Sequence, residues 1–184
     1  MALISSWLSM FRRRQDLIIA ALKLGPGVRL ADVGAGRGYF TFRFAKAIGP
    51  SGVVFAVEPN HPKAALLSRQ AAQAFPMVHV VEPARDDPSL PAAVDLIFLS
   101  NVYHHLADQA AYFRRAARYL RNGGRVAIVE TRQIGWLTRI FGHATDPETI
   151  KAEMVTAGYE LVDSRDFLRL QSFLVFRPSG NPSA

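Results

Sequence analysis

Residues 28–40 read VRLADVGAGRGYF, and this stretch decides the fold. An apolar run ends at Asp32, three glycines follow at alternate positions (Gly34, Gly36 and Gly38), and helical periodicity begins after them. A strand that leads through glycines into a helix N-terminus lets the backbone approach a ligand and donate N–H groups to it. The spacing departs from the GxGxxG of dinucleotide enzymes and lacks the Gly-Lys-Ser/Thr of phosphate loops, so both classes are disfavoured.

Apolar β-branched runs alternate with helical stretches along the rest of the chain, which is typical of a parallel sheet with helices on both faces. The expected strands are 28–33, 53–59, 77–82, 95–100, 125–130, 159–168 and 172–177, and the expected helices between them are 39–48, 62–75, 109–120 and 147–158. The last two strands are separated by too few residues for a parallel crossover, so they form an antiparallel hairpin. We therefore predict an α/β fold, a Rossmann-like doubly wound sheet of seven strands, mostly parallel with an antiparallel C-terminal hairpin.

Length and composition fit one domain over residues 1–184. The chain is 49% hydrophobic and has no cysteine, which excludes disulfides, thiolate-bound metals and a cysteine nucleophile. No apolar run approaches the ~20 residues of a membrane-spanning helix. Positive charges follow, rather than precede, the apolar N-terminal stretch, so no signal peptide is expected and a cytoplasmic location is predicted. Residues 178–184 are expected to form a flexible tail.

The chain carries a net charge of +7, and the excess is concentrated in two clusters. One lies in the first 29 residues and includes Arg12, Arg13 and Arg14; the other runs over residues 112–125. Such clusters suit nucleic acid, acidic carriers or anionic lipid head groups, so peripheral membrane contact stays open. The alternative, which we favour, is that helices present a solvated basic face.

The glycine loop and the segments behind it resemble, in order, class I S-adenosylmethionine-dependent methyltransferases over about residues 17–177. The matching segments are VVFAVEPN with Glu58, the acids Asp86 and Asp87 after the third strand, VDLIFLSNVYHHL, and the Gly-Gly turn of LRNGGRVAIVE. VYHHL and AGYELVDSRDFL are most similar to the small-molecule branch related to quinone-biosynthesis C-methyltransferases.

The resemblance implies S-adenosylmethionine as cofactor and S-adenosylhomocysteine as product. Glu58 would accept the ribose hydroxyls, Asp86, or alternatively Asp87, would accept the adenine amino group, and Asp32 would orient the loop and the cofactor ammonium. The residues assigned to the cofactor are Asp32, Gly34, Ala35, Gly36, Gly38, Glu58, Asp86, Asp87 and Asn101. The family often carries an acid where Asn101 stands, which makes a cationic acceptor less favoured.

Methyl transfer of this kind requires no metal and no covalent residue, but a hydroxyl or activated-carbon acceptor needs a general base. Candidate catalytic side chains follow the fourth strand (Tyr103, His104 and His105), and His143 lies in the irregular stretch after the fifth. Each histidine could equally be a packed or capping imidazole. Residues 1–24 are expected to form a helical lid.

The acceptor is expected to be a small molecule. Trp136 and Phe141 among arginines in residues 131–144 favour a lipophilic or anionic one. A nucleic-acid methyltransferase is the nearest alternative, because the chain is basic and Tyr103 could stack on a base. The stretch SNVYHH lacks the prolines that base-amine methyltransferases carry there, so nucleic acid is disfavoured as a partner. A non-catalytic relative that binds the cofactor is the second alternative. The sequence does not indicate the oligomeric state.

Overall fold

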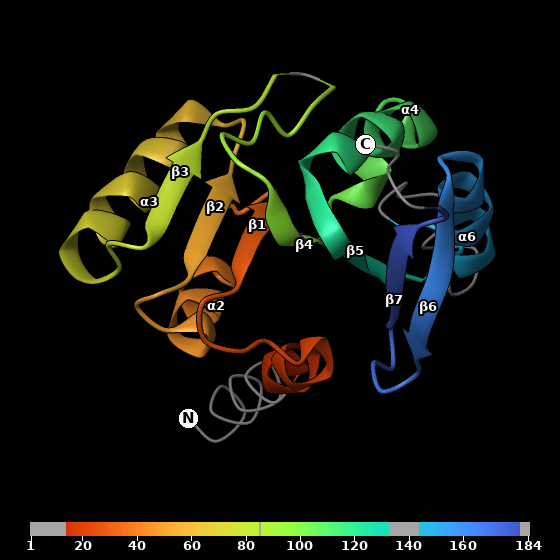
Figure 1. Cartoon of the computed structure of the whole chain (residues 1–184), viewed down its shortest axis with the longest axis horizontal. Helices are drawn as coiled ribbons and strands as arrows, with labels where there is room; N and C mark the ends of the chain where they lie inside the picture. The colour runs from red at the N-terminus through yellow and green to blue at the C-terminus, as the bar shows by residue number, and fades with distance from the viewer. Residues whose placement is uncertain (1–13, 85, 133–143, 181–184) are drawn as a thin grey trace, which may run out of the picture.

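The computed structural model describes residues 14–84, 86–132 and 144–180 (Figure 1). Within these ranges seven strands form one sheet in the order β3-β2-β1-β4-β5-β7-β6. The strands are β1 (Arg29–Val33), β2 (Val53–Val57), β3 (Val78–Val81), β4 (Val94–Ser100), β5 (Leu120–Thr131), β6 (Tyr159–Arg165) and β7 (Gln171–Pro178). The predicted fold class is confirmed.

Strands β1 to β5 run parallel to one another, β7 runs in the opposite direction, and β6 returns to the direction of the first five. β6 and β7 form the predicted antiparallel hairpin, and β7 inserts between β5 and β6 by pairing antiparallel with both. Figure 1 shows this hairpin at the side of the sheet opposite β3.

Successive residues of the central strands enter two separate cores, because side chains of a strand alternate between the faces of the sheet. Leu30 belongs to the core under the helix of residues 14–22, α2 (Thr41–Ile48) and α3 (His61–Ala74). Ala31 belongs to the core under α4 (Gln109–Ala116) and α6 (Pro147–Thr156). Helices cover both faces of the sheet, so both sets of alternating side chains must be apolar. The central strands are apolar along nearly their whole length for this reason.

The helix starts follow from capping chemistry in the sequence. Asn60 accepts from the Lys63 amide at α3, Asp108 from the Ala111 amide at α4, and Asp146 from the Glu148 amide at α6. Each side-chain oxygen satisfies an amide that has no partner within its own helix. Asp108 and Asp146 directly precede the helices that the sequence predicts from residues 109 and 147, so both predicted helix starts are confirmed.

The expected turn at residues 122–124 is wrong in one respect. β5 already begins at Leu120, which pairs with Val94, and the next paired positions are Arg125 and Leu96. The chain between Leu120 and Arg125 bulges out of the ladder, so α4 ends at Ala116 and a short 3₁₀ turn delivers Leu120 to the sheet. Pairing with β4 overrides the helical periodicity that predicted a helix up to residue 120.

Two predicted elements lie partly outside the residues that the structure describes. The helix of residues 14–22 buries Ile18, Ala21 and Leu22 in the core, whereas residues 1–13 of the predicted lid lie outside the described residues. The stretch 133–143, with Trp136 and Phe141, and the end of the predicted tail also lie outside them.

Candidate active site at the carboxyl ends of β1 and β4

The glycine loop lies where the strand order reverses direction. β1 and β4 are neighbours in the sheet, but α2 follows β1 onto one face and α4 follows β4 onto the other. Ligands of open α/β sheets bind in the crevice that such a divergence leaves at the carboxyl ends of the strands.

All three glycines of the loop adopt left-handed backbone angles, with φ of 73°, 59° and 81° at Gly34, Gly36 and Gly38. A Cβ on Gly34 would lie 2.2 Å from the Val102 side chain, and one on Gly38 would meet side chains of α2 and α3. A Cβ on Gly36 would instead meet only one backbone atom, at 3.9 Å. Gly34 and Gly38 are therefore required for packing, while Gly36 faces the crevice.

The loop is fixed to the end of β2. The amides of Gly34 and Ala35 both donate to the Val57 carbonyl, at 2.8 and 3.0 Å. The Gly36 amide donates to Glu58 Oε2 at 2.7 Å, and Glu58 Oε1 accepts from the Asn60 amide at 2.9 Å. These contacts hold a nearly buried carboxylate beside the loop, with lone pairs left to accept further hydrogen bonds.

Two hollows meet around this loop and share Gly34, Gly36, Ser100 and Asn101. The larger, about 540 Å³, extends past Glu58 toward the residues after β3 and β4. Its other lining residues are Val33, Val57, Pro59, Asn60, Lys63, Pro83, Ala84, Asp87, Val102, His105, Leu106 and Tyr112. The smaller, about 280 Å³, is lined additionally by Arg14, Asp32, Ala35, Arg37, Tyr39 and Phe40. The larger hollow is thus lined by apolar and charged residues, and the smaller is lined by a buried acid and two arginines.

Asp32 is the buried acid of the smaller hollow. Burial raises the pKa of Asp32 to about 7, although the Thr41 hydroxyl opposes this shift by donating to Oδ2 at 2.6 Å. A carboxyl group that titrates near neutrality can be ionised by a nearby cation, because an opposite charge favours its charged form.

The two acids after β3 are placed differently. Asp87 lines the larger hollow, but Arg118 donates to its Oδ2 while Tyr119 and the Ser89 amide donate to its Oδ1. Burial pushes the pKa of Asp87 upward, and the hydrogen bonds from Tyr119 and Ser89 together with Arg118 outweigh it, so this pKa lies below its ordinary value. Asp86 is exposed and does not line either hollow. The structure therefore brings the glycine loop and Glu58 together but does not direct a free carboxylate from Asp86 or Asp87 to them.

Asn101 terminates β4 in a left-handed conformation with φ of 53° and lines both hollows. Its Oδ1 accepts from Thr131 Oγ1 at 3.0 Å and from Gln171 Nε2 at 2.8 Å. Because both donors lie on β5 and β7, the carbonyl end of this amide is fixed away from the glycine loop.

The candidate catalytic residues separate into three environments. Tyr103 is 0% exposed, packs on Phe113, and donates its hydroxyl to Glu153 at 2.5 Å. Burial and the Glu153 carboxylate raise the pKa of Tyr103, so this phenol is a structural part of the α4–α6 side rather than of the crevice. His105 lines the larger hollow, and His104 contacts the buried carboxylate of Glu130. His143 lies outside the described residues.

A sequence model of the family described as "Methyltransferase domain" matches residues 31–128, which is more than half of the chain. The chain belongs to this methyltransferase domain family. The match begins within β1, includes the glycine loop and Glu58, and ends within β5.

The relatives of the methyltransferase domain include proteins named for different methyl acceptors. Nocamycin O-methyltransferase of Saccharothrix syringae is 34% identical over 105 residues, covering 56% of this chain and 38% of its own length. The rRNA 2'-O-methyltransferase fibrillarin of Caenorhabditis elegans is 36% identical over 107 residues, covering 56% of this chain and 30% of its own length. The chain thus spans about a third of the length of these curated relatives.

Among solved structures, a SAM dependent methyltransferase from Aquifex aeolicus superimposes on this methyltransferase domain with a TM-score of 0.78. The two are 16% identical, and the alignment covers 88% of each chain. At this identity the likeness establishes the fold, which includes the C-terminal hairpin that the family match does not reach.

Crevice residues of the methyltransferase domain that were not singled out as site candidates from the sequence include Arg14, Asn60, Lys63 and Tyr112. Asn60 had a local signal, because it follows the acid at the end of β2 and precedes Pro62 of a helix. Arg14 and Tyr112 come from elements distant in sequence from the loop, so only the packing of helices on the sheet brings them there.

The second basic cluster is largely satisfied within the methyltransferase domain. Arg115 donates to the Asp86 carbonyl, Arg118 pairs with Asp87, Arg121 pairs with Asp95, and Arg125 donates to the Leu22 carbonyl. These contacts favour a structural role for the cluster over a docking surface.

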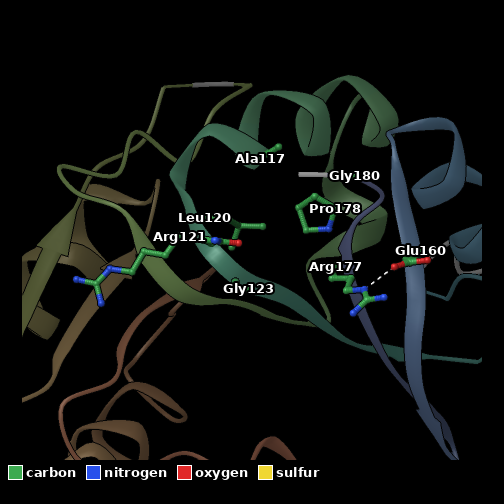
Figure 2. Close-up of a pocket in the computed structure, with 10 residues that line it drawn as sticks. Ala117, Leu120, Arg121, Gly123, Glu160, Arg177, Pro178 and Gly180 are labelled. Atoms are coloured by element: carbon green, nitrogen blue, oxygen red, sulfur yellow. Dashed lines mark hydrogen bonds and ion pairs between the residues drawn. The ribbon is translucent and has the colours of Figure 1, made fainter. Parts of the chain in front are cut away.

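A separate cavity of about 440 Å³ lies beside the start of β5 and shares no lining residue with the two hollows at the glycine loop (Figure 2). It is lined by the bulge before Arg125 and by the outer ends of β6 and β7, where Arg177 pairs with Glu160. Arginine and acid neutralise each other here, so the cavity has no strong charge preference.

Two absences apply to the described part of the chain. No group of three or more histidine or acidic side chains there is arranged to hold a metal ion. No helix among the same residues is long and apolar enough to cross a membrane.

Proposed function

We propose that this methyltransferase domain binds S-adenosylmethionine in the crevice and transfers its methyl group in line to a small-molecule acceptor, releasing S-adenosylhomocysteine. The observation that carries the proposal is the Glu58 carboxylate, whose Oε2 lies 2.7 Å from the Gly36 amide nitrogen at the edge of a hollow of about 540 Å³. In dinucleotide-binding folds, an acid near a glycine loop accepts hydrogen bonds from the ribose hydroxyls, and the glycines leave room for the ligand. Glu58 and Gly36 would serve a nucleoside in the same way.

The residues present fit the cofactor at both ends. Glu58 would accept the ribose hydroxyls, and Asp32 would pair with the ammonium group in the smaller hollow, where Arg14 also lies. Pro83, Leu106 and Tyr112 supply apolar surface for the adenine in the larger hollow. When bound, the cofactor supplies a methyl group that its sulfonium makes electrophilic.

The protein contributes positioning and exclusion of water. The left-handed glycine loop fixes Glu58 relative to β1, and the ends of β4 and β5 form the side from which an acceptor would approach. Fixing two reactants in a near-attack geometry supplies a large part of the rate enhancement of such displacements.

A small-molecule acceptor is supported by the relation to nocamycin O-methyltransferase and by the internal pairing of the second basic cluster. RNA is the second candidate, favoured by the match to fibrillarin. The quinone-related branch, a cytoplasmic location and the lid role of residues 1–24 stay predictions.

Calorimetry with S-adenosylmethionine followed by an assay of S-adenosylhomocysteine release tests the proposal. The acceptor panel consists of phenols, quinols, fatty acids and RNA. Binding in the micromolar range with turnover of one small-molecule class supports it; absence of binding contradicts it. Turnover of RNA alone, with binding that falls steeply as salt rises, would favour the second candidate.

Cofactor affinity is expected to depend on Asp32. Because the pKa of Asp32 lies near 7 in the free protein, this carboxyl group is mostly protonated below that pH and must lose its proton to pair with an ammonium group. Affinity for S-adenosylmethionine should therefore rise by up to about tenfold per pH unit between pH 5.5 and 7 and level off above it. Calorimetry in two buffers should also detect the released proton.

Asp32→Asn supplies the control, because asparagine can still accept from Thr41. In this variant the affinity should be lower at pH 7 and independent of pH over the same range. A parallel pH dependence in both proteins would show that another group titrates. The raised pKa also means that the folded state loses stability as pH rises from about 4 to 7, and Asp32→Asn should remove this loss.

A further inference from the structure

Tyr112 of α4 is a nearly buried phenol whose hydroxyl is unused within the protein. The residue is 5% exposed, lines the larger hollow, and packs its ring edge-on against Phe113. Tyr103 and Tyr159 lie in the same core, and their hydroxyls donate to Glu153 and to the Phe113 carbonyl. The described residues provide no such partner for the hydroxyl of Tyr112. Its oxygen is not sealed inside the protein, so we infer that it is open to the hollow.

The carboxylate that lines the same hollow, that of Asp87, is already engaged. Its Oδ2 accepts from Arg118 at 2.6 Å. Its Oδ1 accepts from Tyr119 at 2.7 Å and from the Ser89 amide at 2.6 Å. These bonds tie the turn after β3 to the segment that follows α4, so Asp87 fixes the wall of the hollow rather than offering a free carboxylate to a ligand.

Tyr112 carries its proton at neutral pH. Burial raises the pKa of this phenol, and the Asp87 carboxylate and Tyr119 shift the pKa in the same direction. A protonated hydroxyl has one hydrogen to donate and two lone pairs to accept, whereas an ionised carboxylate can only accept. A nearly buried hydroxyl depends on a ligand for a hydrogen bond, because little solvent reaches it.

The hydroxyl lies in the hollow that would hold the base of the cofactor. Glu58, the proposed ribose ligand, lines the same hollow, and so do the apolar residues Pro83 and Leu106. Adenine presents an acceptor at N1 beside a 6-amino donor, and hypoxanthine presents a donor at N1 beside a 6-oxo acceptor. A hydroxyl can pair with either edge. A carboxylate placed at the 6-amino group would instead meet the lone pairs of the 6-oxo oxygen.

We propose that Tyr112 recognises the polar edge of the cofactor's base through its hydroxyl, that Asp87 is a positioning residue for the turn beside it, and that the site consequently accepts a 6-oxopurine as well as adenine. This inference rests on the proposed function and specifies how its cofactor is selected. The ligand class is a purine nucleoside linked through sulfur to homocysteine or methionine.

Calorimetry at pH 7.5 with three ligands tests the inference. They are S-adenosylhomocysteine, its deaminated analogue S-inosylhomocysteine, and an analogue with benzimidazole in place of adenine, which has no polar edge. The first two should bind the unmodified protein with affinities that differ by less than about fivefold, whereas a carboxylate bonded to the 6-amino group would separate them by roughly tenfold or more.

Tyr112→Phe removes only the hydroxyl oxygen. It should weaken the binding of the adenine and hypoxanthine ligands about three- to tenfold, the usual contribution of a neutral hydrogen bond, and leave the benzimidazole ligand within about twofold. The matched control is Tyr159→Phe, because the Tyr159 hydroxyl donates to a backbone carbonyl at 3.0 Å and lines neither hollow. This control should leave all three affinities within about twofold.

Asp87→Asn tests the positioning role. This variant weakens the contact with Arg118, so it should lower the affinity for the adenine and hypoxanthine ligands by the same factor and leave their ratio unchanged.

A preference of the unmodified protein for adenine of fivefold or more would overturn the inference, and loss of that preference in Asp87→Asn would assign recognition of the base to this carboxylate. Unchanged affinities in Tyr112→Phe would overturn it, and so would equal losses on all three ligands, because a merely structural role does not depend on the edge of the base. If none of the ligands binds the unmodified protein, the proposed function itself fails.

Discussion

Replacing Glu58 with alanine is expected to weaken the binding of S-adenosylmethionine by at least about 100-fold. A hydrogen bond to a charged group contributes about 1.5–3 kcal/mol, and the variant would lose the two bonds that Glu58 is proposed to accept from the ribose. The change also removes the acceptor of the Gly36 amide, so the loop that faces the crevice loses its support. Isothermal titration calorimetry at pH 7.5 measures the effect directly.

Glu160→Ala is the control for this variant. Glu160 is an exposed acid at the separate cavity beside the start of β5, where it pairs with Arg177. Its loss should change the cofactor affinity by less than twofold. A reduction below tenfold in Glu58→Ala would mean that the ribose is held elsewhere in the crevice, and the assignment of this acid would have to be abandoned.

Gly34→Ala is expected to lower the free energy of unfolding by about 2–5 kcal/mol. Two costs add at this position: a residue with a Cβ is strained by about 1–2 kcal/mol in the left-handed region, and overpacking costs a further 1–3 kcal/mol. The second cost arises because the new methyl group would lie 2.2 Å from the Val102 side chain. Urea unfolding followed by circular dichroism measures the change.

Gly158→Ala separates the two costs. Gly158 also has a positive φ, of 87°, but a Cβ there meets no atom within 4 Å. This variant should therefore lose only the strain of about 1–2 kcal/mol. If both variants lose the same free energy of unfolding, the predicted overpacking at residue 34 is contradicted. Val102 would then be able to move aside for the new methyl group. Val102→Ala in the Gly34→Ala background should recover part of the loss.

The parts of the site that could be predicted from the sequence are those built from one continuous segment. Residues 28–40 contain a strand, a loop and a helix start, and local chemistry decides all three. Glu58 belongs to the same class, because it follows directly on a buried strand and parallel strands end at the same edge of a sheet. The structure places its carboxylate beside the Gly36 amide; that it holds the ribose stays a prediction.

Side-chain partners from distant segments could not be predicted. Asp87 accepts from Arg118 and Tyr119, some thirty residues later in the sequence, and these contacts engage the carboxylate that was expected to reach the adenine. Tyr103 was expected at the crevice, but its hydroxyl donates to Glu153 of α6. In both cases the partner comes from a helix on the sheet, and its position depends on how that helix packs.

The start of β5 illustrates the same limit for the backbone. Residues 112–120 have helical periodicity, and Gly123 and Gly124 have the composition of a turn. Leu120 nevertheless pairs with Val94, because a ladder position beside β4 satisfies backbone groups that a longer helix would leave without partners. Long-range hydrogen bonding overrides a local preference here.

The sequence by itself determined the class of the sheet, its strand sequence, the helix caps and the glycine loop with its neighbouring acid. These features depend on local propensity, period-2 burial and capping chemistry, all of which act over a few residues. Only the tertiary structure decided that Glu130 is buried against His104, that Asp32 titrates near neutrality, and that most of the second basic cluster is paired internally. Burial and the distance between charges set these properties, and both depend on segments that meet only when the sheet and its helices are assembled.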